Sequence, residues 1–203
     1  MESDTLSTPQ EISSLKKILL ENIKEYYSSG SITLHEIKKG ATLHNVFVAG
    51  LTPSFFALKP DKAKINFFAR GYGSKQCDYI LLSEFKNKRI VVFVELKSSV
   101  FIQSASAETP CKDPNGKYED YVTQLKSSSC LWDYLHAVLS RFETCNVLGN
   151  DYKRYFVVLH NKDVPPIGRD IPLTRPSSND TPENAYIRRT EDNEHLQLSQ
   201  LIR

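Results

Sequence analysis

The chain has 203 residues, of which 40% are hydrophobic and 25% are charged, and its formal net charge at pH 7 is +2. A chain of this length can bury one good core but leaves little room for two full domains. The small net charge excludes a uniformly basic nucleic-acid-binding domain, so contacts with a polyanion would have to come from local clusters of Lys and Arg.

Cysteine usage and hydropathy favour a cytoplasmic protein that has no contact with membranes. No Cys-x-x-Cys pair and no zinc-like spacing of histidines is present, so structural zinc is not expected. The longest apolar run, Ile90 to Val94, is far shorter than the ~20 residues that a membrane-spanning helix needs, and we find no signal sequence. We therefore expect reduced thiols at all four cysteines, Cys77, Cys111, Cys130 and Cys145.

The first third of the chain predicts a helix, two segments that fit either helix or strand, and a strand. Thr8-Pro9-Gln10-Glu11 has the form of a capping box with proline at the first helical position, so a helix is expected over residues 9–27. Residues 32–37 and 42–48 fit either a short helix or a strand, and this alternative stays open. Residues 64–69 predict a strand.

Two neighbouring segments then predict a β-hairpin. Cys77 to Leu82 and Arg89 to Lys97 are rich in β-branched and aromatic residues, and the segment between them is short and polar. If Lys86 to Lys88 form the turn, facing residue numbers sum to roughly 173 to 175. This register places Asp78 opposite the segment from Glu95 to Lys97.

Glu-x-Lys triplets occur three times in the chain, so the triplet alone indicates nothing. Only Glu95-Leu96-Lys97 ends an apolar strand that is expected to be buried on both faces, where an ionised pair is costly unless it is partnered or bound to metal. Two interpretations stay open: a functional site, or a purely structural salt bridge with Asp78. The other two copies, Glu36-Ile37-Lys38 and Glu84-Phe85-Lys86, are expected on the surface.

The remaining chain predicts a long loop, a second helix, a strand and an extension. Residues 98–117 predict the loop, and helical periodicity follows over residues 118–139. Gln124 lies at the edge of the apolar stripe of this helix, where it can reach the Glu95-Lys97 strand end. Residues 155–160 predict a buried strand, and the prolines after Asp163 predict an extended arm, in which residues 185–203 carry a short terminal element.

The order helix, three strands, helix, strand, with Asp78 on the second strand and Glu95-Leu96-Lys97 on the third, resembles the PD-(D/E)XK nuclease superfamily. The resemblance covers about residues 9–160. It implies an α/β restriction-endonuclease-like domain over residues 1–162, with a mixed four-stranded sheet flanked by helices in the order α-β-β-β-α-β. A proline-rich C-terminal extension over residues 163–203 would follow this domain.

Two positions depart from the family's pattern. Cys77, rather than proline, precedes Asp78, and Ser128 occupies the tyrosine position of the Gln-x-x-x-Tyr signature that Gln124 would begin in the RecB-like branch. The branch is therefore left open.

The resemblance implies a magnesium-dependent site, in which Mn²⁺ would also substitute. Asp78 and Glu95 would supply carboxylate ligands and Leu96 a carbonyl ligand, which are the hard oxygen donors that Mg²⁺ prefers. Lys97 would orient or deprotonate the attacking water and stabilise developing charge. Gln124 would position water or substrate. Two cations, Arg70 and Lys75, are candidate contacts to the nucleic-acid backbone.

The expected function is that of an endonuclease acting on DNA rather than RNA, in restriction or anti-phage defence. Cleavage of both strands of a duplex would favour a homodimer, and assembly into a larger effector complex is a second arrangement. Two other classes stay open. One is a catalytically inactive nucleic-acid-binding or assembly module of the same fold, and the other is an unrelated α/β interaction domain whose charges form a buried ion-pair network.

Overall fold

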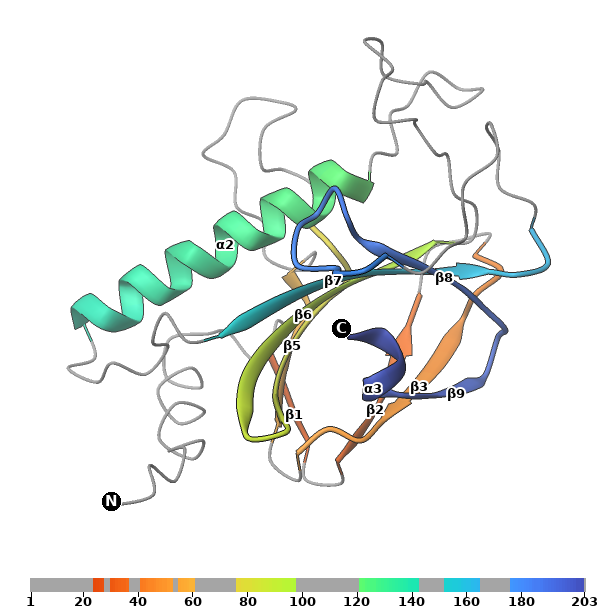
Figure 1. Ribbon diagram of the computed structural model, residues 1–203, viewed down its shortest axis with the longest axis horizontal. Coiled ribbons are helices and arrows are strands. Elements are labelled where there is room, and N and C mark those ends of the chain that lie inside the picture. The colour runs from red at the N-terminus through yellow and green to blue at the C-terminus, as the bar shows by residue number, and fades with distance from the viewer. Residues whose placement is uncertain are drawn as a thin grey trace, which may run out of the picture.

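The computed structural model describes residues 24–27, 30–36, 41–52, 55–60, 76–97, 121–142, 152–164 and 176–202. These ranges contain nine strands and two helices: β1 (Lys24–Tyr27), β2 (Ser31–His35), β3 (Asn45–Ala49), β4 (Phe55–Leu58), β5 (Tyr79–Phe85), β6 (Lys88–Lys97), α2 (Tyr121–Phe142), β7 (Lys153–Asn161), β8 (Tyr186–Thr190), β9 (Glu194–Gln197) and α3 (Leu198–Leu201). The chain is therefore a mixed α/β protein that is mostly strand (Figure 1).

The larger sheet has six strands in the order β1-β4-β5-β6-β7-β8. The pairs from β1 to β6 are antiparallel, whereas β6, β7 and β8 run parallel to one another. The two central strands are β5 and β6, and eight consecutive residues of β6, from Ile90 to Lys97, are buried. This burial on both faces agrees with the uninterrupted apolar run in the sequence.

The predicted hairpin is confirmed as β5 and β6. Tyr79 faces Val94 and Phe85 faces Lys88, which is a register within the predicted range. Lys86 and Asn87 form the turn with φ values of 51° and 59°. Two consecutive positive φ values match the twist of the flanking strands, as a two-residue hairpin turn requires.

A second sheet of three strands, in the order β2-β3-β9, resolves the open choice in the first part of the chain. Residues 31–35 and 45–49 are strands rather than helices, and they pair antiparallel. Strand β9 then pairs parallel to β3, which joins the C-terminal part of the chain to this sheet.

The two sheets and α2 form three layers (Figure 1). Helix α2 lies on one face of the six-stranded sheet, where Leu125 and Trp132 pack with Phe93 and Phe156. The three-stranded sheet covers the other face, where side chains such as Leu34 pack in one core with those of β5, β6 and β7. The central strands are thus enclosed on both sides.

Two parts of the expected fold need correction. The main sheet has six strands instead of four, and among the described residues a three-stranded sheet packs on the face opposite α2. The expected helix over residues 9–27 is wrong for Lys24–Tyr27, which pair with Phe55–Leu58 as β1 because strand pairing overrides local helix propensity. The expected helix before Lys24 and the expected strand over residues 64–69 lie outside the described residues.

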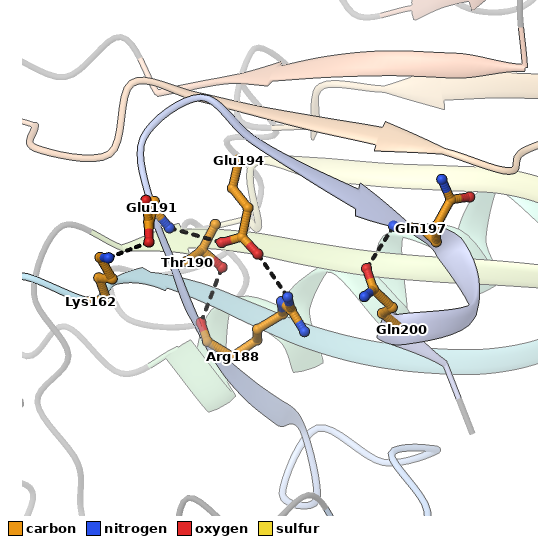
Figure 2. Close-up of polar contacts among 7 residues, drawn as sticks. All are labelled: Lys162, Arg188, Thr190, Glu191, Glu194, Gln197 and Gln200. Carbon is orange, nitrogen blue, oxygen red and sulfur yellow. Dashed lines mark hydrogen bonds and ion pairs between the residues drawn. The ribbon is translucent and has the colours of Figure 1, made fainter.

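The described part of the C-terminal extension, residues 176–202, belongs to both sheets. Strand β8 lies at the edge of the larger sheet and β9 at the edge of the smaller one. Arg188 Nη2 on β8 donates to Glu194 Oε1 on β9 at 2.8 Å, and Lys162, directly after β7, pairs with Glu191 in the connection between β8 and β9 (Figure 2). These contacts tie the connection to the large sheet, so this part of the extension packs against the rest of the protein instead of projecting from it.

Among the described residues, no helix is both long and apolar enough to cross a membrane.

Candidate catalytic centre

Asp78 lies immediately before β5, at the open end of the β5–β6 hairpin. Its Oδ2 accepts a hydrogen bond of 2.7 Å from the backbone N–H of Leu96 on β6. The residue is only 9% exposed. This bond holds the carboxylate beside the end of β6, as the predicted register requires.

Glu95 and Lys97 lie near the end of β6 and form an ion pair, with 2.7 Å between Glu95 Oε1 and Lys97 Nζ. They alternate with Leu96, so their side chains share the sheet face of Phe93, which α2 covers. Glu95 is 0% exposed and Lys97 is 5% exposed. The expected burial of both side chains is confirmed, and Asp78 lies at the same end of the hairpin.

Helix α2 places Gln124 above this pair. Lys97 Nζ donates a hydrogen bond of 2.8 Å to Gln124 Oε1, and Gln124 Nε2 donates one of 3.3 Å to the carbonyl oxygen of Gln76. The periodicity of the helix sufficed to predict that Gln124 reaches the strand end. Gln124 therefore links Lys97 to the segment that leads into Asp78.

Ser128 is a member of this network that the sequence analysis did not include among the site residues. Its hydroxyl accepts a hydrogen bond of 2.7 Å from the backbone N–H of Cys77 and donates one of 3.0 Å to Gln76 Oε1. The spacing of four residues from Gln124 puts both side chains on one helix face, and this spacing is the signal that could have revealed Ser128. One turn of α2 therefore fixes the chain just before Asp78.

The field of the two carboxylates reaches the thiol of Cys77. Burial raises the pKa of this thiol well above its usual value, and the negative charges of Glu95 and Asp78 raise it further, against the opposing hydrogen bond from Ser128. Both carboxylates therefore lie near one buried sulfur atom. A thiol whose pKa is raised in this way is a poor nucleophile.

The centre presents oxygen atoms of the type that bind a divalent cation. Within the described ranges, no group of three or more His, Cys, Asp and Glu side chains is arranged to hold a metal ion. Asp78 and Glu95 supply two carboxylates, and the Leu96 carbonyl is a third oxygen at the same strand end. Two carboxylates and water suffice for Mg²⁺, which keeps several waters in protein sites, so these residues fit such an ion.

Other expectations from the sequence have mixed outcomes. Of the triplet Glu84-Phe85-Lys86, only Lys86 lies in the turn and is exposed, whereas Glu84 and Phe85 end β5 and are half-buried. Glu36, in contrast, is only 8% exposed, so its expected surface position is wrong. It directly follows β2, and its backbone N–H donates to the carbonyl oxygen of His44 at 3.0 Å, which holds it inside the small sheet. Arg70 and Lys75 lie outside the described residues.

Comparisons with family models, with curated proteins and with solved structures find no match to this chain.

Proposed function

We propose that this protein is a metal-dependent endonuclease that hydrolyses phosphodiester bonds of DNA, in restriction or anti-phage defence. The observation that carries the proposal is the fully buried Glu95–Lys97 pair beside Asp78 at the end of an apolar sheet. Buried ion pairs contribute little net stability, so their presence favours a chemical role.

The arrangement of the strands supports a PD-(D/E)XK-like core within the larger sheet. The run β5, β6, α2 and β7 has the order strand, strand, helix, strand, with β5 antiparallel and β7 parallel to β6. Asp78 precedes the first of these strands and Glu95 and Lys97 end the second, as the resemblance in sequence implies. The additional strands extend this core at both edges.

Lys97 would act on the attacking water and on the charge that develops at phosphorus. An ammonium group paired with a carboxylate donates hydrogen bonds, and this suits orienting a water and stabilising a phosphorane-like transition state rather than accepting a proton. In the reaction, the water oxygen would form a bond to phosphorus while the bond to the leaving oxygen opposite it breaks; the water would lose its proton to the solvent, and the leaving oxygen would take one up. Gln124 holds the Lys97 ammonium in place through its 2.8 Å hydrogen bond, so we regard it as a positioning residue.

Asp78 and Glu95 would hold the metal ion, with the Leu96 carbonyl as a further ligand. When bound, Mg²⁺ or Mn²⁺ would neutralise phosphate charge and lower the pKa of a bound water. The hydrogen bond from the Leu96 N–H fixes one oxygen of Asp78, so the backbone of β6 sets the orientation of this carboxylate.

The burial of the centre favours one alternative, a catalytically inactive nucleic-acid-binding or assembly module of the same fold. Asp78, Glu95, Lys97 and Gln124 are all less than a tenth exposed, as in a closed ion-pair network. An active centre would have to open to admit a phosphodiester, whereas an inactive module would not. Activity measurements separate these two functions directly.

The test is cleavage of supercoiled, linear and single-stranded DNA, and of RNA, with Mg²⁺, Mn²⁺ or EDTA. We expect cleavage of DNA that requires the metal and that falls at least about 100-fold in Lys97→Met, because an electrostatic stabiliser of the transition state is removed. Lys97→Arg keeps the ion pair and should also lose most activity, so it separates loss of chemistry from loss of folding.

Lys126→Met is the matched control, because Lys126 is an exposed lysine on α2 and pairs only with the exposed Glu183 among the described residues. Its activity should equal that of the wild type. Cleavage that survives in Lys97→Met or in EDTA would overturn the assignment, and absence of cleavage with every substrate and metal would favour the inactive module.

A further inference from the structure

A row of three basic side chains crosses the large sheet at the candidate centre. Lys97 on β6 faces His160 on β7, and His160 faces Arg189 on β8. Because these strands are parallel and in register, paired residues project from the same face of the sheet. The row therefore begins at the centre and runs along the α2 face to the edge strand β8.

His160 occupies the middle of this row in an unusual environment. It is 0% exposed, and neither of its ring nitrogens has a hydrogen-bond partner among the residues that the structure describes. Buried polar groups normally have partners, so an unsatisfied one indicates either a cost in stability or a ligand that is absent here. Burial, and secondly the charge of Arg189, lower the pKa of His160, so the neutral ring has one N–H to donate.

Arg189 forms the outer end of the row. It is exposed and is paired with His160 in the register of β7 and β8, and its charge acts on the His160 ring. The neighbouring Arg188 binds Glu194 and alternates with Arg189, so of these two arginines Arg189 projects from the sheet face of His160 and Lys97. Two strand spacings, roughly 10 Å, separate the backbones of Lys97 and Arg189.

We propose that Arg189 binds a backbone phosphate of the nucleic-acid substrate, next to the phosphate that is cleaved at Lys97, and that His160 contacts the same phosphate once the centre has opened to admit the substrate. This inference rests on the proposed function. The guanidinium of Arg189 donates charge-assisted hydrogen bonds to phosphate oxygens, and the neutral ring of His160 donates a further one. A phosphate contact of this kind fixes the position of the backbone without reading sequence.

The test is binding and cleavage of a fluorescently labelled duplex oligonucleotide by the full chain and by Arg189→Gln. Binding is measured with Ca²⁺, which prevents turnover, over a range of salt concentrations. We expect Arg189→Gln to weaken binding about tenfold and to reduce the slope of log K against log salt by about 1. With Mg²⁺, the change should appear in KM rather than in kcat.

Arg141→Gln is the matched control, because it removes the same charge from an exposed residue at the far end of α2. The distance from Gln124 along the helix is roughly 25 Å. Arg141→Gln should leave affinity and salt slope unchanged, and Arg189→Lys should restore part of the affinity. Equal affinity of Arg189→Gln and wild type would overturn the inference.

The two proposals fail in different ways. If the wild type cleaves DNA and loses cleavage in Lys97→Met while Arg189→Gln binds normally, the phosphate site is wrong and the nuclease stands. If no DNA is cleaved but binding depends on Arg189, the phosphate site stands in a module without catalysis.

Discussion

The Asp78 carboxylate accepts a hydrogen bond of 2.7 Å from the backbone N–H of Leu96, across the open end of the β5–β6 hairpin. The register of the hairpin and the position of the acid are therefore coupled. Because Leu96 lies between Glu95 and Lys97 in the sequence, the same hydrogen bond places Asp78 beside the Glu95–Lys97 ion pair. A shift of register by one residue would turn Glu95 and Lys97 to the other sheet face.

The Glu95–Lys97 pair predicts strongly non-additive effects on stability. Lys97→Met removes the ammonium that faces a fully buried carboxylate and should lower the free energy of unfolding by about 3–5 kcal/mol. The double variant Glu95→Gln with Lys97→Met replaces both charges and should recover most of this loss. Urea unfolding of the wild type, Glu95→Gln, Lys97→Met and the double variant checks this, and additive effects would show that the two charges do not interact.

The buried ring of His160 predicts a loss of stability in weak acid. Its pKa in the folded protein lies below the ordinary value of 6.5, mainly because of burial. As pH falls below about 6.5, the unfolded chain binds a proton that the folded chain does not, so the free energy of unfolding falls by at most about 1.4 kcal/mol per pH unit. Above that pH, His160 is neutral in both the folded and the unfolded state, so this loss of stability is absent.

His160→Gln should remove this part of the pH dependence. Urea unfolding of wild type and variant between pH 7.5 and 5 measures the two slopes. Identical slopes would mean that His160 takes up its proton in the folded state as readily as in the unfolded one.

Replacing the buried amide of Asn179 with a carboxylate should destabilise the protein severely. Its side-chain Nδ2 donates to the carbonyl oxygens of Phe156 and Leu201, at 3.1 and 2.9 Å, and the residue is only 2% exposed. Asn179→Asp replaces the donor with a buried carboxylate that faces two carbonyl oxygens, so the free energy of unfolding should fall by about 3 kcal/mol or more at pH 7. The loss should shrink at pH 4 relative to wild type, since protonation restores one donor. A loss that does not depend on pH would contradict this explanation.

Removing the Ser128 hydroxyl should destabilise the protein moderately, because this hydroxyl joins α2 to Cys77. Ser128→Ala removes the acceptor of the Cys77 N–H and should lower the free energy of unfolding by about 1–3 kcal/mol, because that buried donor loses its partner. Cys130→Ala, at an exposed position of the same helix, should change it by less than about 0.5 kcal/mol. Thermal unfolding of both variants provides the comparison, and equal melting temperatures would place the attachment elsewhere.

The hairpin and the position of Gln124 could be predicted from the sequence because both depend on local patterns. Two apolar runs around a polar tip define β5 and β6, and helical periodicity directs Gln124 to their end. The small sheet could not be predicted, since β9 pairs with β3 across nearly the whole length of the chain. The position of His160 between Lys97 and Arg189 was also missed, because it depends on the parallel register of β6, β7 and β8.

The assignment of Lys24–Tyr27 to a helix failed for a related reason. A capping box predicts where a helix begins, but the end of the element depends on β4, which offers backbone partners to these residues. Long-range pairing thus decided the structure where local propensity was ambiguous.

The central claim is that Asp78 and Glu95 form a divalent-cation site, and thermal unfolding during a Mn²⁺ titration tests it most directly. We predict a saturable rise in melting temperature, equivalent to about 2.7 kcal/mol at a concentration 100 times Kd. The rise should vanish in Asp78→Asn, which keeps the size of the side chain, and persist in Asp180→Asn, where the exposed acid lies outside the centre. A melting temperature that does not change with Mn²⁺, or that rises equally in Asp78→Asn, would contradict the claim and leave a closed ion-pair network.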